Sequence, residues 1–203
     1  MNSLIRLLAV SLILFSGAVS STVIRNVDGT GQLLGASNVD VGGVLYDVEF
    51  VAGTCTDLFN GCDELSDFAF NTLPSAQLAV SALMDTVLID TVDGLFDSDP
   101  SLTNGCSAIP VCFILTPYEF INIATIKIVG VRNALSEPSD SHTVGGNAIG
   151  KNENFAAHPF FNYARWSPSE VSDVPEPSTL IIFCLGLIGL ARKYAGNLAR
   201  PVV

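Results

Sequence analysis

Hydrophobic and polar side chains alternate along several stretches of this 203-residue chain. A period of two is the pattern of a β-strand with one buried face, and branched and aromatic residues favour strands. Stretches with these properties are 22–27, 32–41, 44–51, 111–115, 120–123, 125–131 and 160–166. Gly42 and Gly43 separate the second stretch from the third and admit the positive φ angles of a tight hairpin. The sequence therefore predicts mainly antiparallel strands.

One segment has a helical period instead. Between residues 76 and 89 the apolar side chains recur at steps of three and four, which places them on one helix face. Thr72 is the expected N-cap, Pro74 is tolerated in the first turn, and Gly94 is suited to stop the helix. We predict one packed helix from about residue 73 to 91.

The fold class that follows is α+β, with a mainly antiparallel sheet of five or six strands and the one packed helix. An all-β sandwich with a helical insertion is the alternative. Residues 133–154 show neither period and are expected to form a long surface loop.

Both ends of the chain are apolar. At the N-terminus Arg6 precedes an apolar run at 7–19, and small side chains at Ala18 and Ser20 suit a signal peptidase. We therefore expect a signal peptide at 1–20, with an uncleaved anchor or a buried helix as the alternatives. At the C-terminus a hydrophobic helix with a transmembrane segment at 179–191 is expected. The domain organisation is then signal peptide 1–20, exported domain 21–166, linker 167–173 and C-terminal segment 174–203.

The part of the chain between the two ends is strongly acidic. Residues 21–174 hold 19 acidic and five basic side chains. Such a charge repels nucleic acid and anionic lipid surfaces, so we expect no nucleic-acid partner.

Four cysteines lie in the expected exported domain as two close couples, Cys55 with Cys62 and Cys106 with Cys112. Export places them in an oxidising compartment, where this spacing favours two local disulfides. A zinc site made of the four thiolates is the competing interpretation. Structural zinc sites usually have closer spacings, so we favour disulfides.

Three carboxylates, Asp93, Asp97 and Asp99, crowd into seven residues. Clustered oxygen ligands are what Ca²⁺ requires, which makes this group a calcium candidate. The spacing lacks the alternate ligands, the central glycine and the distal glutamate of an EF-hand loop. We therefore favour a solvated turn and expect neither a metal nor another cofactor.

No arrangement of residues in the sequence indicates a catalytic site. A Gly-x-Ser-x-Gly turn is missing, and His142 and His158 lie in or beside the expected long loop. Paired carboxylates, as in glycosidases, remain the enzymatic alternative, since the many acidic residues supply many pairs. Phe161, Tyr163 and Trp166 either form a sugar-stacking surface or belong to the core, and we favour the core. We expect a protein without enzymatic activity.

The C-terminal segment has three parts in a fixed order. Pro175, Glu176 and Pro177 come first, the apolar run follows, and Arg192 and Lys193 close it. This order resembles the PEP-CTERM sorting signal of Gram-negative bacteria. The upstream domain also looks like the short, disulfide-bearing exported domains that such proteins carry.

The resemblance implies a route and a set of partners. Signal peptidase and an exosortase would act on the chain, and the inner membrane would hold it transiently. The protein would then reach the cell surface or the extracellular matrix, with a non-enzymatic role associated with exopolysaccharide in biofilm. A secreted glycosidase-like hydrolase is the alternative function.

Overall fold

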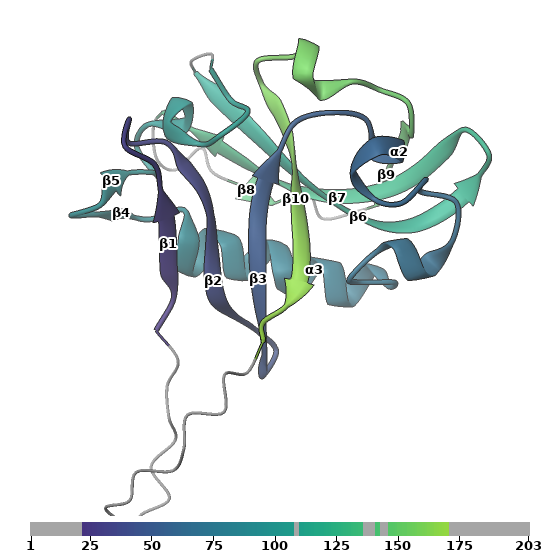
Figure 1. The fold of residues 1–203 in the computed structure, drawn as a ribbon, viewed down its shortest axis with the longest axis horizontal. Coiled ribbons are helices and arrows are strands. Elements are labelled where there is room, and N and C mark those ends of the chain that lie inside the picture. Colours follow the sequence, from purple (N-terminus) through teal and green to yellow (C-terminus); the bar gives the residue numbers. More distant parts are fainter. Residues whose placement is uncertain (1–21, 108–109, 136–140, 143–145, 171–203) are drawn as a thin grey trace, which may run out of the picture. The chain divides into compact units, whose positions relative to one another are not determined.

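The computed structural model describes residues 22–107, 110–135, 141–142 and 146–170 (Figure 1). The predicted signal peptide at 1–20 and the predicted sorting signal at 174–203 lie outside these residues. Among the described residues, no helix has both the length and the apolar content needed to cross a membrane. The predicted transmembrane segment at 179–191 is outside them as well.

One mixed sheet of eight strands organises the described domain, in the order β1-β2-β3-β10-β6-β7-β8, with β9 also paired to β7. Its strands are β1 (Ile24–Val27), β2 (Leu33–Val41), β3 (Val44–Val51), β6 (Val111–Asn122), β7 (Thr125–Ala134), β8 (Ser141–His142), β9 (Asn147–Gly150) and β10 (Phe161–Pro168). All pairs are antiparallel except β10 with β6. The fold is thus mostly sheet with one packed helix, but the predicted count of five or six strands is too low.

The first hairpin follows the sequence pattern closely. Val41 pairs with Val44, so that Gly42 and Gly43 form the turn with φ angles of 65° and 91°. Asp40 Oδ1 accepts a hydrogen bond of 2.6 Å from the Gly43 amide, which closes the turn further. Both predicted arms of this hairpin are present as β2 and β3.

The second half of the sheet accounts for the difference between the predicted and the observed strands. Residues 111–115 and 120–123, predicted as two separate stretches, are joined in the single strand β6, which ends at Asn122 and has an irregularity between Pro117 and Glu119. Proline has no amide proton for the ladder, and a bulge accommodates it. The prediction of an unbroken loop at 133–154 is also wrong, because β8 and β9 pair with β7. β9 is largely exposed, so its sequence carries no alternating pattern.

Helix α3 (Leu73–Ala82) lies across one face of the sheet (Figure 1). It begins as predicted, with the Thr72 hydroxyl accepting from the Ser75 amide at 3.4 Å. It ends earlier than predicted: one π-helical segment, η2 (Leu83–Val87), follows, and Asp90–Thr91 already forms the short strand β4, paired with β5 (Gly94–Leu95). Arg25 donates hydrogen bonds to the carbonyls of Thr86 and Val87, which satisfies acceptors left free at the end of the helical segment.

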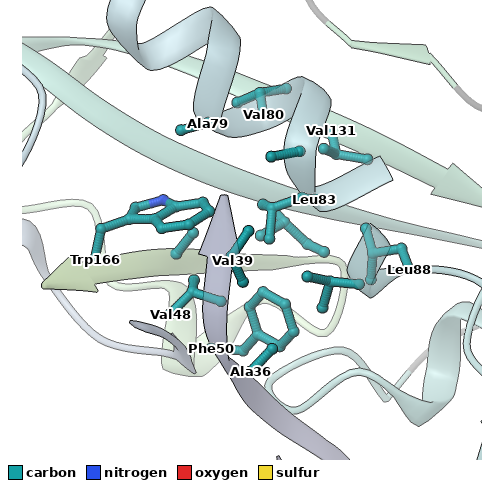
Figure 2. Close-up of a cluster of buried hydrophobic side chains, with 14 of the residues drawn as sticks. Ala36, Val39, Val48, Phe50, Ala79, Val80, Leu83, Leu88, Val131 and Trp166 are labelled. Carbon is teal, nitrogen blue, oxygen red and sulfur yellow. The ribbon is translucent and has the colours of Figure 1, made fainter. Parts of the chain in front are cut away.

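The larger hydrophobic core lies between α3 and the sheet. Figure 2 shows Ala79, Val80 and Leu83 of the helical segment opposite side chains of the strands, all of them buried. The strand residues labelled there are Ala36, Val39, Val48, Phe50, Val131 and Trp166. A second, smaller core occupies another part of the domain and includes Tyr163, Leu115 and Ile128. Short helices complete the described chain, namely α2 (Cys55–Leu58), η1 (Leu65–Asp67), η3 (Pro100–Leu102) and η4 (Phe155–Ala157).

Candidate functional site

Strand alternation gives the sheet a second apolar surface, away from α3. On β10, Tyr163 belongs to the smaller core whereas its neighbours Ala164 and Trp166 belong to the core under α3. On β6, Leu115 and Ile114 divide between the two cores in the same way. The smaller core therefore lies on the face of the sheet opposite the helix.

Part of this second surface is hollowed into an apolar groove with a volume of about 510 Å³. Strands β6, β7, β9 and β10 and the segment around η4 line it. The lining residues are Phe113, Leu115, Ile128, Asn147, Ile149, Gly150, Glu153, Phe155, His158 and Phe161. Most of these are hydrophobic, so the groove presents carbon atoms to any occupant, with polar groups at few positions.

Three phenyl rings are stacked along the groove. Phe113 and Phe161 are neighbours in the parallel pair β6 and β10, and their ring centroids lie 4.9 Å apart at an interplanar angle of 16°. Phe155 continues the series, 5.3 Å from Phe161 at 21°. The parallel pairing of β10 with β6 therefore creates the aromatic part of the site.

The polar part of the groove is a pair of side chains from the η4 segment. His158 Nε2 lies 3.3 Å from Glu153 Oε1, and both side chains are about half exposed, at 49% and 52%. Asn154 caps η4 by accepting a hydrogen bond from the Ala156 amide at 3.0 Å. The cap fixes the turn between the two groups, so the carboxylate and the imidazole meet at the exposed edge of the groove.

The first disulfide supports the wall that carries these groups. Cys55 and Cys62 are joined, with their Cα atoms 5.9 Å apart, which is the local pairing that the spacing favours. Asn60, Gly61 and Cys62 all have positive φ, a conformation that glycine adopts readily, asparagine less so and cysteine rarely. Lys151 Nζ donates to the Gly61 carbonyl at 3.0 Å, and the Phe155 amide donates to the Gly53 carbonyl at 3.0 Å. The disulfide loop and the η4 segment are thus held together by backbone acceptors.

The second disulfide lies in the other core. Cys106 and Cys112 are joined with a Cα–Cα distance of 5.7 Å, and both are buried in the core under α3. The structure therefore shows the local pairing in both couples, and no thiolate of the four is free to bind zinc.

Tyr163 lies behind the groove and not in its lining. The side chain is fully buried, its ring is 4.9 Å from that of Phe155, and its hydroxyl has no hydrogen-bond partner within the described structure. Burial raises the pKa of the Tyr163 phenol, and the charge of Glu153 raises it further. The three aromatic residues considered for sugar stacking do not share a surface, because Tyr163 is buried and Trp166 belongs to the opposite core. Only Phe161 of the three lines the groove.

The three calcium candidate residues form hydrogen bonds in and around their own turns. Asp99 caps η3 by accepting from the Ser101 amide at 3.1 Å, and the amide of Asp97 donates to Asp90 Oδ1 at 3.0 Å. Asp93 donates its amide to the Thr91 hydroxyl at 3.2 Å. Within the described ranges, which include all three carboxylates, no group of three or more His, Cys, Asp or Glu side chains is placed to hold a metal ion.

The two histidines are not brought into one described site. His158 lies at the groove, whereas His142 contributes its backbone to β8, paired with Val131. The groove itself was not anticipated from sequence, since its rings come from β6, β10 and a segment without periodicity. The only advance indication was the unusual density of phenylalanine, with Phe155, Phe160 and Phe161 close together in the chain.

Comparison with known proteins gives one match. Residues 173–193 match the sequence profile of a family described as the PEP-CTERM protein-sorting motif. The chain carries a PEP-CTERM sorting motif. No curated protein and no solved structure matches the chain.

The PEP-CTERM match contains both predicted sorting elements. Pro175, Glu176 and Pro177 stand at its beginning, and Arg192 and Lys193 at its end. A motif of this kind implies export, processing by an exosortase, and a cell-surface or extracellular location. The match begins at residue 173, so the groove-bearing domain lies outside it.

Proposed function

We propose that this chain is an exported protein that an exosortase cuts near Pro175-Glu176-Pro177, releasing the domain upstream of the cut to the cell surface or extracellular matrix. The observation that carries the proposal is the PEP-CTERM match at 173–193. A predicted signal peptide at 1–20 supplies the entry to the export pathway. Signal peptidase and exosortase are then the two processing partners.

The physical properties of the tail support a temporary membrane stage. A helix from Ser178 to Ala191 would be about 21 Å long, against roughly 30 Å of hydrocarbon, so it makes a marginal anchor. Arg192 and Lys193 favour the cytoplasmic side. The Pro-Glu-Pro segment would then lie at the outer face, where its prolines resist joining the helix and leave the backbone open to a protease.

We further propose that the released domain has a non-enzymatic role and associates with exopolysaccharide. The groove does not favour the glycosidase-like alternative, because Glu153 is the one carboxylate among its described lining residues. Hydrolysis of a glycosidic bond by paired carboxylates needs two such groups. The two disulfides support an extracellular role for the domain, since they persist in oxidising compartments.

Processing is tested by mass spectrometry of the protein in a host that contains its exosortase. The full chain and a Glu176→Ala variant are compared, with Glu170→Ala as a matched control upstream of the motif. We expect the full chain and the control to end near residue 177 on the cell surface, and Glu176→Ala to accumulate uncut in the membrane fraction. Surface protein that still contains Arg192 would contradict the proposal.

Association with exopolysaccharide is tested separately. The mature protein is quantified on cells and in the medium, in the parent host and in a strain that makes no exopolysaccharide. We expect the protein to move into the medium when the polysaccharide is missing, with its C-terminus unchanged. Equal retention on both strains would remove the polysaccharide from the proposal while leaving the processing step intact.

A further inference from the structure

The groove on the second face of the sheet has the size and lining of a small-molecule site. Its volume of about 510 Å³ lies in the usual range for ligand pockets, roughly 300–1,000 Å³. Such pockets are mainly apolar and contain a few polar groups that orient the ligand. Here the apolar part is formed by Phe113, Phe155, Phe161 and four aliphatic or small residues of the strands, and Glu153 and His158 supply the polar end.

The aromatic lining suits an apolar body better than a sugar. A sugar ring stacks on a free and exposed ring face. Phe161 already stacks with Phe113 and Phe155, and Phe155 is 6% exposed. Little ring face is therefore left for a sugar or for a cation–π contact, whereas an apolar chain fits against ring edges and aliphatic side chains.

The charge of the site is what favours a cation at the polar end of the groove. Glu153 stands at the groove, and the described lining includes no lysine or arginine. His158 Nε2 lies 3.3 Å from the carboxylate, so both polar groups are at the same end of the groove. Residues 21–174 carry 19 acidic against five basic side chains, and the resulting field attracts cations and repels carboxylates and phosphates.

We propose that this groove binds a small organic cation with an apolar body, of the alkyl- or aryl-ammonium class. The apolar body lies along Phe113, Phe161 and Ile149, and the ammonium group faces the Glu153 carboxylate. This assignment is independent of the sorting reaction, which acts on a different part of the chain.

The test compares three probes that share one octyl chain: octyltrimethylammonium, 1-octanol and octanoate. Their affinities for the exported protein, as isolated from its producing host, are measured by calorimetry at pH 7.5 and low salt. We expect the cation to bind about three- to fivefold more tightly than the alcohol, and octanoate to bind most weakly, because the carboxylate is half exposed. High salt should reduce the difference between the probes.

Two variants separate the charge from the apolar surface. Glu153→Gln is expected to bring the cation to the affinity of octanol without changing octanol binding. Ile149→Trp, on the exposed strand β9, is expected to fill the groove and abolish binding of all three probes. Ile123→Trp is the matched control for that change, because Ile123 is 87% exposed and outside the groove.

Several results would overturn the proposal. They are octanoate binding as tightly as the cation, Glu153→Gln leaving the preference unchanged, and the folded wild-type protein binding none of the probes. Circular dichroism of each variant shows that it is folded, so that loss of binding is not confused with loss of structure. None of these measurements depends on the C-terminal cleavage.

Discussion

Lys151 Nζ and the Gly61 carbonyl are joined by a 3.0 Å hydrogen bond, although 90 residues separate them in the chain. Lys151 begins the segment that carries Glu153, Phe155 and His158 into the groove, and Gly61 belongs to the loop closed by the first disulfide. The Lys151 ammonium group therefore holds one wall of the groove in place.

Replacing Lys151 with methionine keeps the apolar stem and removes the donor. We expect the free energy of unfolding to fall by about 1 kcal/mol, because the Gly61 carbonyl loses a charged partner in a half-buried position. Urea denaturation measures the change. Lys127→Met is the matched control, since Lys127 forms a surface ion pair with Glu119 and its loss is expected to matter less. An equal effect in both variants would contradict the importance assigned to Lys151.

Removing the first disulfide should weaken the same wall. The double change Cys55→Ser with Cys62→Ser opens a loop whose cysteines are separated by seven positions, and about 2 kcal/mol of stability should be lost. Hydrogen exchange should increase first at 53–62 and 151–158, the segments that hydrogen bonds join. Exchange that rises equally throughout the sheet would contradict this local effect.

Removing the buried hydroxyl of Tyr163 should make the folded protein more stable. Its oxygen has no partner within the described structure, so Tyr163→Phe should stabilise the fold by about 1 kcal/mol at pH 7. Tyr46→Phe, on the opposite face beside Phe70, is the control and should change little. A clear loss of stability in Tyr163→Phe would reveal a hydrogen bond from a buried water.

The same residue makes stability depend on alkaline pH. Burial raises the pKa of Tyr163 in the folded state above the ordinary phenol value of about 10. Below about pH 10 the phenol is protonated in both states, and the free energy of unfolding does not depend on it. As the pH rises above that value, only the unfolded chain releases the proton, so the free energy of unfolding falls. Unfolding curves between pH 8 and 11.5 should show this decline. The Tyr163→Phe variant should show a shallower decline of stability with pH. The decline that remains should come from Tyr118, whose pKa is also raised by burial.

Asp90 is the acidic residue on which the turn around β4 and β5 depends. Its carboxylate accepts hydrogen bonds from the amides of Asp97 and Ser98, each at 3.0 Å, and from the Ser98 hydroxyl. These bonds, that of the hydroxyl first, lower its pKa, so the stabilisation is present at neutral pH and lost as the pH falls through the acid range. Asp90→Asn should cost about 0.5 kcal/mol after solvent screening, measured by thermal unfolding. Asp93→Asn is the control and should have a smaller effect.

Local rules predicted the local parts of the fold. The glycine pair fixed the hairpin of β2 and β3, and Thr72 marked the start of α3, because each depends on neighbours in the chain. The sequence placed the end of the helical segment too late, since Leu88 is buried and continues the apolar period after η2 has ended at Val87. The exposed strand β9 was missed because an edge strand needs no apolar face.

The groove required information that a sequence pattern does not contain. Phe113 and Phe161 meet only because β10 inserts in parallel beside β6, a pairing between distant strands. Phe155 and Glu153 come from a stretch where neither period is present. The disulfide couples, in contrast, were close enough in sequence for their spacing to indicate the partners.

Strand β10 is the last element of the described fold and also lies inside the sheet, between β3 and β6. Without it, the other strands of this sheet form two separate groups, β1–β3 and β6–β9, and the facing edges of β3 and β6 have no partner. The domain therefore completes its hydrogen-bonded ladder only when nearly the whole chain ahead of the sorting motif has been delivered. If the chain crosses a membrane starting from its N-terminus, the two groups can join into one sheet only after β10 has crossed as well.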